Sequence, residues 1–396
     1  MKIINLLNIK TKAILFLFME LKRLFRSMFL KFHHQNIRFI IPVVINIAVK
    51  FLMFLWVQFS INNRPELFSY RSWLGMFTIW DGGWYNLIAR YWYEDILMNP
   101  PISIEQLFAF PPGFPALIRA LGFLVGDFLI SQAVIALFFG IVWIPLFQLV
   151  AEEYLSQEES FSATLIASLF PIVFIFTTVG YSEGLFLTLI LSSWLLYLRN
   201  KHLPASILAA GASLVRWLGS LIVAPFFVES VIRKRFGRAL LYTLPVLSQI
   251  TWFYYGYLRT GNIFVVFEAQ KYWKNRLFWS QFAEPALFQK NPPFSFNLPY
   301  TESFMGLALC LLAIFILFAA KVYEIDWKLG AYFTLTLIFI IYSGSIISYP
   351  RFLSFIFPLW FLFRMKRDWR LIPASLTLGF LNLITGYLFA RWVFLG

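Results

Sequence analysis

Long apolar runs alternate along the chain with short stretches that carry most of the charged residues. A helix that crosses a membrane needs about 20 apolar residues, and fewer where it ends at a cavity. This pattern predicts an all-α protein, a polytopic transmembrane helical bundle with about eleven spans. We expect the spans near residues 39–60, 128–150, 161–179, 182–198, 203–215, 217–231, 239–258, 303–320, 329–343, 352–363 and 371–392.

Composition supports the membrane assignment. Hydrophobic residues make up 60% of the 396 positions and charged residues only 13%, whereas a soluble domain has about 25% charged residues. A soluble enzyme, a disordered chain and a nucleic-acid-binding domain are therefore excluded, and the single Cys310 cannot support a disulfide scaffold. The net charge of +14 comes from short basic clusters between apolar runs, which is typical of loops beside the anionic headgroups of membrane lipids.

Basic residues also set the expected orientation. Residues 1–38 contain many Lys and Arg residues and no apolar stretch long enough to span, so we expect a cytoplasmic basic arm rather than a signal peptide. Residues 39–396 then form a single transmembrane domain. With the N-terminus inside, the cytoplasmic loops are 151–160, 199–202, 232–238, 321–328 and 364–370.

This topology leaves two long outer loops, at about 61–127 and 259–302. Within the first loop, residues 113–126 are too short to span and contain Arg119, so we expect this segment to lie in the membrane interface. Pro115 is expected to be the first residue of this interfacial helix. The first outer loop thus carries interfacial helices outside the bundle.

The clearest candidate for chemistry is Asp81, which lies early in the first outer loop among Trp80, Gly82, Gly83, Trp84 and Tyr85. Aromatic faces beside one carboxylate suit a sugar-binding site, because rings stack on the CH faces of a sugar while the acid accepts a hydroxyl. The alternative is an aromatic belt at the membrane surface with a solvated Asp. Residue types alone favour neither interpretation.

Further charged residues lie on the same predicted side. Glu183 follows Ser182, a good N-cap, so it can simply favour the positive end of a helix. Arg216 and Arg351 interrupt apolar runs, and Lys271 lies in the second outer loop. Such cations can extend toward lipid phosphates, but Arg also offers the paired donors that a buried phosphate needs.

Two other features bear on function. Lys50 lies inside the first span, where a charge is costly unless it faces the bundle interior. His33, His34 and His202 have no metal-ligand spacing with Cys, Asp or Glu, so we expect no metal site.

The motif Trp80-Asp81-Gly82-Gly83-Trp84-Tyr85 resembles the signature of the PIG-V family, the glycosylphosphatidylinositol mannosyltransferase II proteins and their prokaryotic relatives in the GT-C superfamily. Segments similar to later motifs of that family follow in the same order. Two details depart from its pattern: the Phe-Pro element has an extra residue, and Leu214-Val215-Arg216-Trp217 stands where the family has Leu-Thr-Arg-Pro. The later motifs are at Phe110–Arg119, Tyr181–Phe186, Ala269–Trp273 and Pro350–Leu359.

The resemblance implies an inverting glycosyltransferase that moves a hexose, mannose in this family, from a polyprenyl-phosphate donor to a lipid or glycan acceptor at the outer face of a prokaryotic plasma (inner) membrane. Phosphate is a good leaving group, so one carboxylate suffices to accept the proton of the acceptor hydroxyl, whereas a glycosidase uses two carboxylates. No cofactor or metal is implied. The implied roles are Asp81 as base, Arg216, Arg351 and Lys271 on the phosphate, Glu183 and Gln270 on sugar hydroxyls, and Trp80, Trp84 and Tyr85 as walls.

The alternative function is a lipid-linked glycan flippase or transporter. Such proteins place polar groups near the membrane midplane, on broken helices and often in repeated halves. In this sequence the candidate acids lie in outer loops and no internal repeat is visible, so that only Lys50 favours transport.

Overall fold

The computed structural model describes residues 37–98, 101–273, 314–343, 348–366 and 369–393. Over these residues the chain is helical, and its extended pairing is limited to an isolated bridge between Ile96 and Ile102. The expected all-α class is therefore confirmed. Residues 1–36, which make up nearly all of the expected basic arm, lie outside the described residues, as does most of the second outer loop.

Three helices are long and apolar enough to cross a membrane: α2 (Ile37–Asn63), α6 (Phe128–Ala151) and α20 (Leu371–Ala390). Helix α2 packs against both of the others. Much of its remaining surface is apolar and exposed, including Phe51 and Phe59. Exposed apolar side chains along a helix of this length are what lipid contact requires, so the chain has the features of an integral membrane protein.

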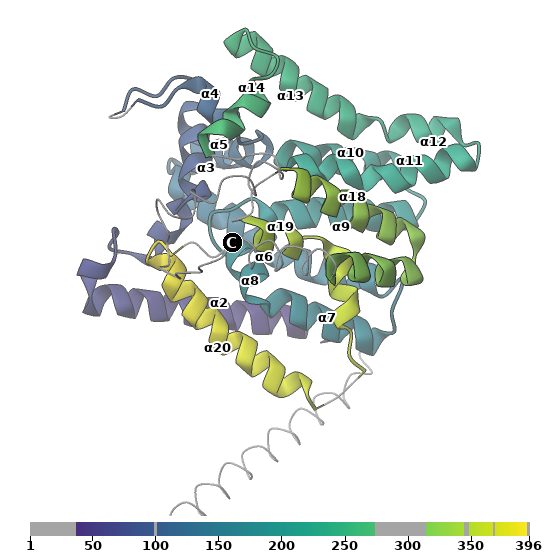
Figure 1. Cartoon of the computed structure of the whole chain (residues 1–396). Coiled ribbons are helices and arrows are strands. Elements are labelled where there is room, and N and C mark those ends of the chain that lie inside the picture. Colours follow the sequence, from purple (N-terminus) through teal and green to yellow (C-terminus); the bar gives the residue numbers. More distant parts are fainter. Residues whose placement is uncertain (1–36, 99–100, 274–313, 344–347, 367–368, 394–396) are drawn as a thin grey trace, which may run out of the picture.

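The remaining apolar helices of the bundle are shorter. Helix α9 (Glu183–Leu198) lies between α6 and α10 (His202–Val215), and α10 also contacts α13 (Leu244–Thr260). Most of α9 is buried, which makes it the centre of the packed core. Figure 1 shows α9 and α10 within the molecule, with α2 and α20 forming one flank and α13 another.

Three of the expected continuous spans are broken near prolines. Proline lacks the backbone N–H and disfavours helical conformation in the residue before it, and the breaks come just before Pro171, Pro245 and Pro358. Residues 161–179 are α7 (Gln157–Leu169) and α8 (Pro171–Phe176), residues 239–258 are α12 (Phe236–Leu241) and α13, and residues 352–363 are the end of α19 (Tyr349–Ser354) and the 3₁₀ helix η6 (Phe357–Phe363).

Other expected spans differ less from the structure. Residues 217–231 form a 3₁₀ turn, η3 (Trp217–Ile222), that continues into α11 (Val223–Ile232), and residues 329–343 lie in α18 (Trp327–Ser343). Of the expected span 303–320, only the part from residue 314 onward is described, and it is helical.

The segment expected to be the first outer loop carries short helices. In chain order they are η1 (Pro65–Leu67), η2 (Trp73–Thr78), α3 (Asp81–Tyr91), α4 (Ile104–Leu107) and α5 (Gly113–Val125). Helix α5 begins at Gly113 and not at Pro115, because a proline is tolerated anywhere in the first turn, where the N–H has no partner inside the helix. The left-handed Gly126 then ends α5, and the Asp127 side chain caps α6.

Lys50 is buried in α2 and has backbone partners. Its Nζ donates to the carbonyl oxygens of Gly140, at 2.7 Å, and Thr177, at 3.3 Å. Thr177 is the C-cap of α8, where a positive charge is favourable. The amino group of Lys50 therefore donates a hydrogen bond to the carbonyl at the end of α8, at a point where α2, α6 and α8 meet.

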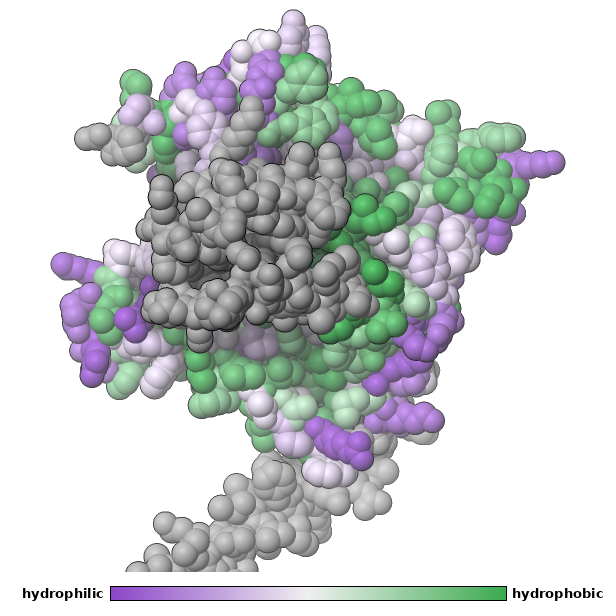
Figure 2. Space-filling view, in the orientation of Figure 1, coloured by the Kyte–Doolittle hydropathy of each residue, from purple (hydrophilic) through white to green (hydrophobic). Residues whose placement is uncertain are grey.

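Polar and apolar surfaces separate along the molecule. In Figure 2, hydrophilic residues gather mainly toward the left and right edges, while hydrophobic residues cover much of the described surface between them. In Figure 1 the left edge holds the end of α2 and the segment between α2 and α3, and the right edge holds α11 and α12. This distribution fits a bundle whose two ends are in water.

Candidate active site

The position of Asp81 is set by a tight turn between η2 and α3. Asp81 is the first residue of α3, where a helix end favours a carboxylate, and its backbone N–H donates to the hydroxyl of Tyr181 at 3.2 Å. The preceding Trp80 has a φ of 51°, which is uncommon for a residue other than glycine. Its side chain remains 38% exposed and packs edge-to-face against Trp392 after α20.

Glycines allow three backbone segments to meet beneath Asp81. A Cβ atom on either Gly82 or Gly180 would collide with the carbonyl oxygen of Phe77, at the end of η2. The two glycines are therefore required by close backbone approach. This contact joins the start of α3 to the segment that leads into α9.

The side chain of Gln132, on α6, holds the same three segments together. Its buried amide nitrogen lies 2.9 Å from the carbonyl oxygen of Phe77, 2.8 Å from that of Gly82 and 2.9 Å from that of Gly180. An amide group has two hydrogens, so one of them is shared. The amide oxygen of Gln132 accepts a hydrogen bond from the side chain of Asn86 in α3. Gln132 therefore also holds α3 against α6.

Arg351 reaches Asp81 from the far end of the chain. It lies on α19 and is buried, and its Nη1 is 2.8 Å from Oδ2 of Asp81. Its Nε is 3.6 Å from Oε1 of Glu183. Burial by itself lowers the pKa of Arg351, but the facing carboxylates of Asp81 and Glu183 outweigh that effect and raise the pKa above its usual value.

Glu183 and Arg216 form a second ion pair beside the first. Glu183 begins α9 with 0% exposure, and its Oε1 lies 2.5 Å from Nη1 of Arg216. Arg216 lies between α10 and η3 in an extended backbone conformation, and it also approaches the hydroxyl of Ser182 at 3.3 Å. Two carboxylates and two guanidinium groups from four separate parts of the chain thus form one neutral cluster, which we call the Asp81 cluster.

Aromatic residues surround this cluster. Tyr85 hydrogen-bonds through its hydroxyl to Ser182 at 3.1 Å, and burial raises its pKa to about 12, so the hydroxyl stays protonated. The Tyr85 ring contacts Phe110 and Phe114 edge-to-face, and Trp84 stacks on Phe110. The Phe-Pro segment before α5 therefore packs against the helix that begins with Asp81.

Apart from Trp80 and Trp84, the predicted site residues divide into three groups. Asp81, Glu183, Arg216 and Arg351 are joined in the Asp81 cluster, and Tyr85 is connected to it through Ser182. Gln270 lies on the 3₁₀ helix η4 (Ala269–Trp273) and donates to the carbonyl of Ala109 at 3.3 Å. This hydrogen bond joins η4 to the Phe-Pro segment. Lys271 is on the same helix, and its side chain lies outside the described residues.

Several residues of this site were missed by the sequence analysis. Gln132 had one available signal, a long polar side chain inside an apolar run, but nothing in the run indicates which groups it binds. Tyr181 and Ser182 were noted as motif members without the hydrogen bonds that join them to Asp81 and Tyr85.

The described side chains offer no evident metal site. Within residues 37–98, 101–273, 314–343, 348–366 and 369–393, no three His, Cys, Asp or Glu side chains are grouped so that they could hold a metal ion. The chemistry available at the Asp81 cluster is that of carboxylates as proton acceptors and guanidinium groups as anion ligands.

Comparisons with known proteins do not identify a family. No protein-family model matches the sequence, and no curated protein matches it. Three solved structures from Archaeoglobus fulgidus are similar in fold, all of them oligosaccharyltransferases: the apo form (TM-score 0.49, 11% identity), a complex with Zn and sulfate (0.48, 12%), and AglB with an inhibitory peptide and a dolichol-phosphate (0.46, 12%).

These matches cover 93%, 91% and 93% of this chain, but only 57%, 53% and 56% of the respective solved chains. The chain thus spans little more than half the length of the proteins it resembles. At these values the similarity assigns neither a family nor an activity.

Proposed function

We propose that this protein is a membrane glycosyltransferase of the GT-C type that transfers a hexose from a polyprenyl-phosphate donor to a hydroxyl of a lipid or glycan. The observation that carries the proposal is the pairing of Asp81 with Arg351 beside Glu183 and Arg216. One carboxylate and two guanidinium groups in one place are the parts that such a transfer needs. The PIG-V-like motif supports mannose as the hexose.

Burial of these charges is itself informative. Taking an ion pair out of water costs several kcal/mol per ion, and the attraction between the partners does not always offset this cost. Replacing such a pair by apolar residues often leaves a protein as stable or more stable. A buried cluster of two acids and two arginines is therefore better explained by a ligand that it must bind.

The arginines suit the phosphate of the donor. A guanidinium group has five N–H donors in a fixed plane, so it can bind a carboxylate and a phosphate oxygen together. We propose that Arg351 contacts the donor phosphate and in doing so loosens its hold on Asp81. The carboxylate oxygen is then free to accept a hydrogen bond from the acceptor hydroxyl.

In the proposed transfer, the bond between the anomeric carbon and the phosphate oxygen breaks, and its electron pair leaves with the phosphate. The acceptor oxygen forms the new bond to the anomeric carbon from the opposite face, which inverts the anomeric centre. Asp81 takes the proton that the acceptor hydroxyl loses. Arg351 and Arg216 neutralise the charge that develops on the departing phosphate.

The other residues have supporting roles. We propose that Trp80, Trp84 and Tyr85 line the sugar, and that Lys271 and Gln270 approach it from the second outer loop. Glu183, which the motif resemblance assigns to a sugar hydroxyl, is fully buried against Arg216. We therefore assign it the task of holding the Arg216 guanidinium in position.

The proposal also includes an orientation. The N-terminus and the loops at 199–202 and 232–238 face the cytoplasm, and the Asp81 cluster faces the outside of a prokaryotic plasma membrane. It further requires that helices shorter than 18 residues, such as α9 and α10, complete the expected set of about eleven spans where the bundle is thin.

The contacts of Lys50 do not favour transport. The flippase alternative depends on Lys50, whose side-chain nitrogen already donates to two backbone carbonyls and needs no cargo as a partner.

Reconstitution tests the proposal. The purified protein is placed in liposomes with radiolabelled polyprenyl-phosphate mannose and a lipid extract as acceptor. We expect label in a new glycolipid or glycan product. Label that crosses the bilayer while it remains on polyprenyl phosphate would contradict the proposal and indicate a flippase.

A further inference from the structure

A second charged site lies at the opposite end of the bundle from Asp81. It is a cavity of about 180 Å³ between the turn from α9 to α10, the turn from α11 to α12 and the start of α18. Figure 1 shows α11 and α12 at the edge farthest from α3. The Asp81 cluster contributes nothing to this cavity, so it calls for a separate explanation.

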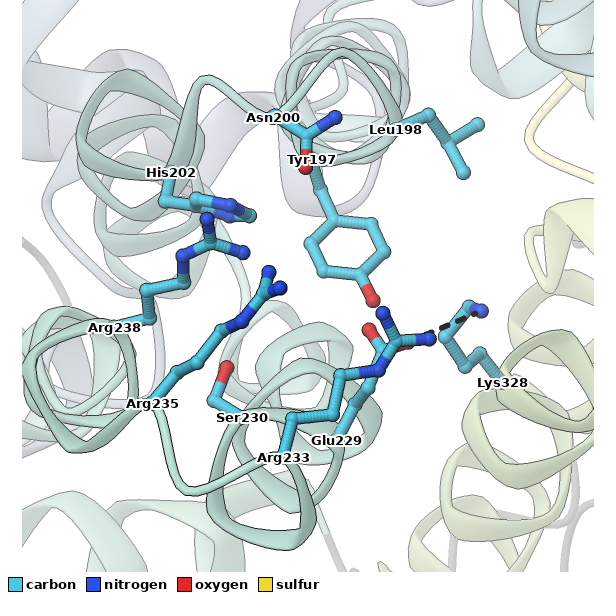
Figure 3. A pocket seen from close by; sticks show the side chains of 10 residues that line it. All are labelled: Tyr197, Leu198, Asn200, His202, Glu229, Ser230, Arg233, Arg235, Arg238 and Lys328. Atoms are coloured by element: carbon cyan, nitrogen blue, oxygen red, sulfur yellow. Dashed lines mark ion pairs between the residues drawn. The ribbon is translucent and has the colours of Figure 1, made fainter.

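Positive charge dominates the lining of the cavity. Four of its ten residues are Arg or Lys, namely Arg233, Arg235, Arg238 and Lys328, and one is an acid, Glu229. Glu229 is shared by Arg233, at 2.8 Å, and Lys328, at 3.9 Å (Figure 3). No carboxylate in the described part of the chain forms an ion pair with Arg235 or Arg238.

His202 adds a neutral donor or acceptor beside those two arginines. Its Nδ1 is 2.7 Å from the hydroxyl of Tyr242, while its Nε2 is buried and has no hydrogen-bond partner among the described residues. Burial, followed by the charges of Arg238 and Arg235, lowers the pKa of His202. The imidazole is therefore uncharged at neutral pH and can offer one hydrogen bond to a ligand in the cavity.

The surroundings of the cavity are apolar and exposed. Ile232 at the end of α11 is 71% exposed, and Phe236 and Leu240 on α12 are 66% and 69% exposed. In the sequence, Ile232 directly precedes Arg233, Phe236 lies between Arg235 and Arg238, and Leu240 follows Arg238. Exposed apolar groups alternating with cations are typical of a segment at the lipid headgroup boundary.

We propose that this cavity binds the phosphate of an anionic phospholipid headgroup, with Arg235 and Arg238 as its principal ligands and the acyl chains lying beside Phe236 and Leu240. A phosphate monoester or diester fits a pair of guanidinium groups that have no carboxylate partner. The lipid is on the side where we expect the cytoplasmic loops. This site does not depend on the proposed transferase function.

Lipid binding tests the proposal directly. The purified full-length protein is titrated with dioleoyl phosphatidic acid and with dioleoyl phosphatidylcholine, and bound lipid is counted by native mass spectrometry. We expect a clear preference for phosphatidic acid and about 30-fold weaker binding of it by the double variant Arg235→Gln/Arg238→Gln, since both cations near the headgroup are lost.

The matched control removes the same charge from the same region. Lys201 and Lys234 are exposed, lie next to cavity residues in the sequence and do not line the cavity. Lys201→Gln/Lys234→Gln should retain most of the affinity for phosphatidic acid. An equal loss in the control, or equal binding of both lipids by the native protein, would overturn the proposal.

Two further measurements separate the lipid from free phosphate and report on the site itself. Titration with sodium phosphate should give much weaker binding, and an affinity equal to that of phosphatidic acid would overturn the lipid assignment.

In NMR spectra of histidine-labelled protein, phosphatidic acid should raise the pKa of His202, because the bound anion offsets the positive charges of the two arginines. An unchanged His202 pKa with lipid bound would place the lipid elsewhere and contradict the proposal.

Discussion

The charges around Asp81 balance, and each of them depends on the others. Glu183 has 0% exposure and contacts both guanidinium groups. Its Oε1 lies 2.5 Å from Nη1 of Arg216 and 3.6 Å from Nε of Arg351. Removing one member of a buried ion pair leaves an uncompensated charge, which costs about 3–5 kcal/mol. At the residue scale the cluster therefore behaves as a unit.

This dependence can be measured in a double-mutant cycle. We expect Glu183→Gln and Arg216→Gln each to lower the free energy of unfolding, and the double variant to lose at least about 1 kcal/mol less than the sum of the two, because it leaves no unpaired charge. Unfolding in detergent micelles, followed by circular dichroism, gives the three values.

An exposed ion pair of the same protein provides the control for this cycle. Arg259 and Glu94 are 3.7 Å apart with side chains 37% and 67% exposed. Their coupling should be near zero, as for surface pairs in general. A coupling between Glu183 and Arg216 as small as this control would show that the cluster does not act as a unit.

At the scale of elements, the start of α3 depends on close backbone contact. The end of η2, the first turn of α3 and the segment before α9 meet at Gly82 and Gly180, and Gln132 of α6 binds a carbonyl of each. Asp81 has its place because these segments cannot move apart without losing the amide contacts.

Alanine substitution should reveal this requirement. A methyl group at Gly82 collides with the carbonyl oxygen of Phe77, so Gly82→Ala should destabilise the protein by about 1–3 kcal/mol and reduce any activity that depends on Asp81. At Gly237, in α12, an added Cβ meets nothing within 4 Å. Gly237→Ala should therefore be neutral or stabilising by up to about 1 kcal/mol.

The melting temperatures of both variants check this expectation: Gly82→Ala should melt below the native protein, and Gly237→Ala at the same temperature or above it. Equal melting temperatures for Gly82→Ala and the native protein would show that the three segments are not tightly packed beneath Asp81.

At the scale of the whole molecule, the two charged sites lie at opposite ends of a helical bundle with apolar flanks (Figures 1 and 2). If the bundle crosses a membrane as proposed, the Asp81 cluster and the basic cavity face different aqueous compartments. The sequence has one cysteine, Cys310, so this arrangement can be tested with engineered thiols.

Labelling from each side of the membrane tests the orientation. In a Cys310→Ser background, Glu94→Cys after α3 should react with an impermeant maleimide from the outside of intact cells, and Lys234→Cys should react only after the membrane is opened. Both positions are exposed in the protein, so an absence of labelling reflects the membrane and not burial. Labelling of both from the same side would contradict the proposed topology.

Much of this architecture could be predicted from the sequence. The helices α2, α6 and α20 correspond to long apolar runs, whose length indicates a span. The motif around Asp81 and the isolated positions of Glu183, Arg216 and Arg351 identified the residues that the fold brings together.

What the sequence could not predict are contacts made across large separations. The breaks before Pro171 and Pro358 were available as local signals, but apolar runs on both sides outweighed them. Lys50 and the amide nitrogen of Gln132 donate to backbone carbonyls in distant parts of the chain, and a carbonyl cannot be identified as a partner from the sequence. The basic cavity is likewise formed by separate parts of the chain, two turns between helices and the start of α18, none of which is unusual by itself.

The most direct test of the account is the role of Asp81 in sugar transfer. The variant Asp81→Asn keeps the size of the side chain and loses its ability to accept a proton, and a base contributes about 10²–10⁴ in rate. The control is Asp95→Asn in the same loop, whose side chain accepts a hydrogen bond from the backbone of Ile104 and can do so as an amide.

Transfer of radiolabelled mannose from polyprenyl phosphate is measured for both variants and the native protein at equal amounts of folded protein. The account predicts a loss of about 10²–10⁴-fold for Asp81→Asn and near-native transfer for Asp95→Asn. Near-native transfer by Asp81→Asn would contradict it.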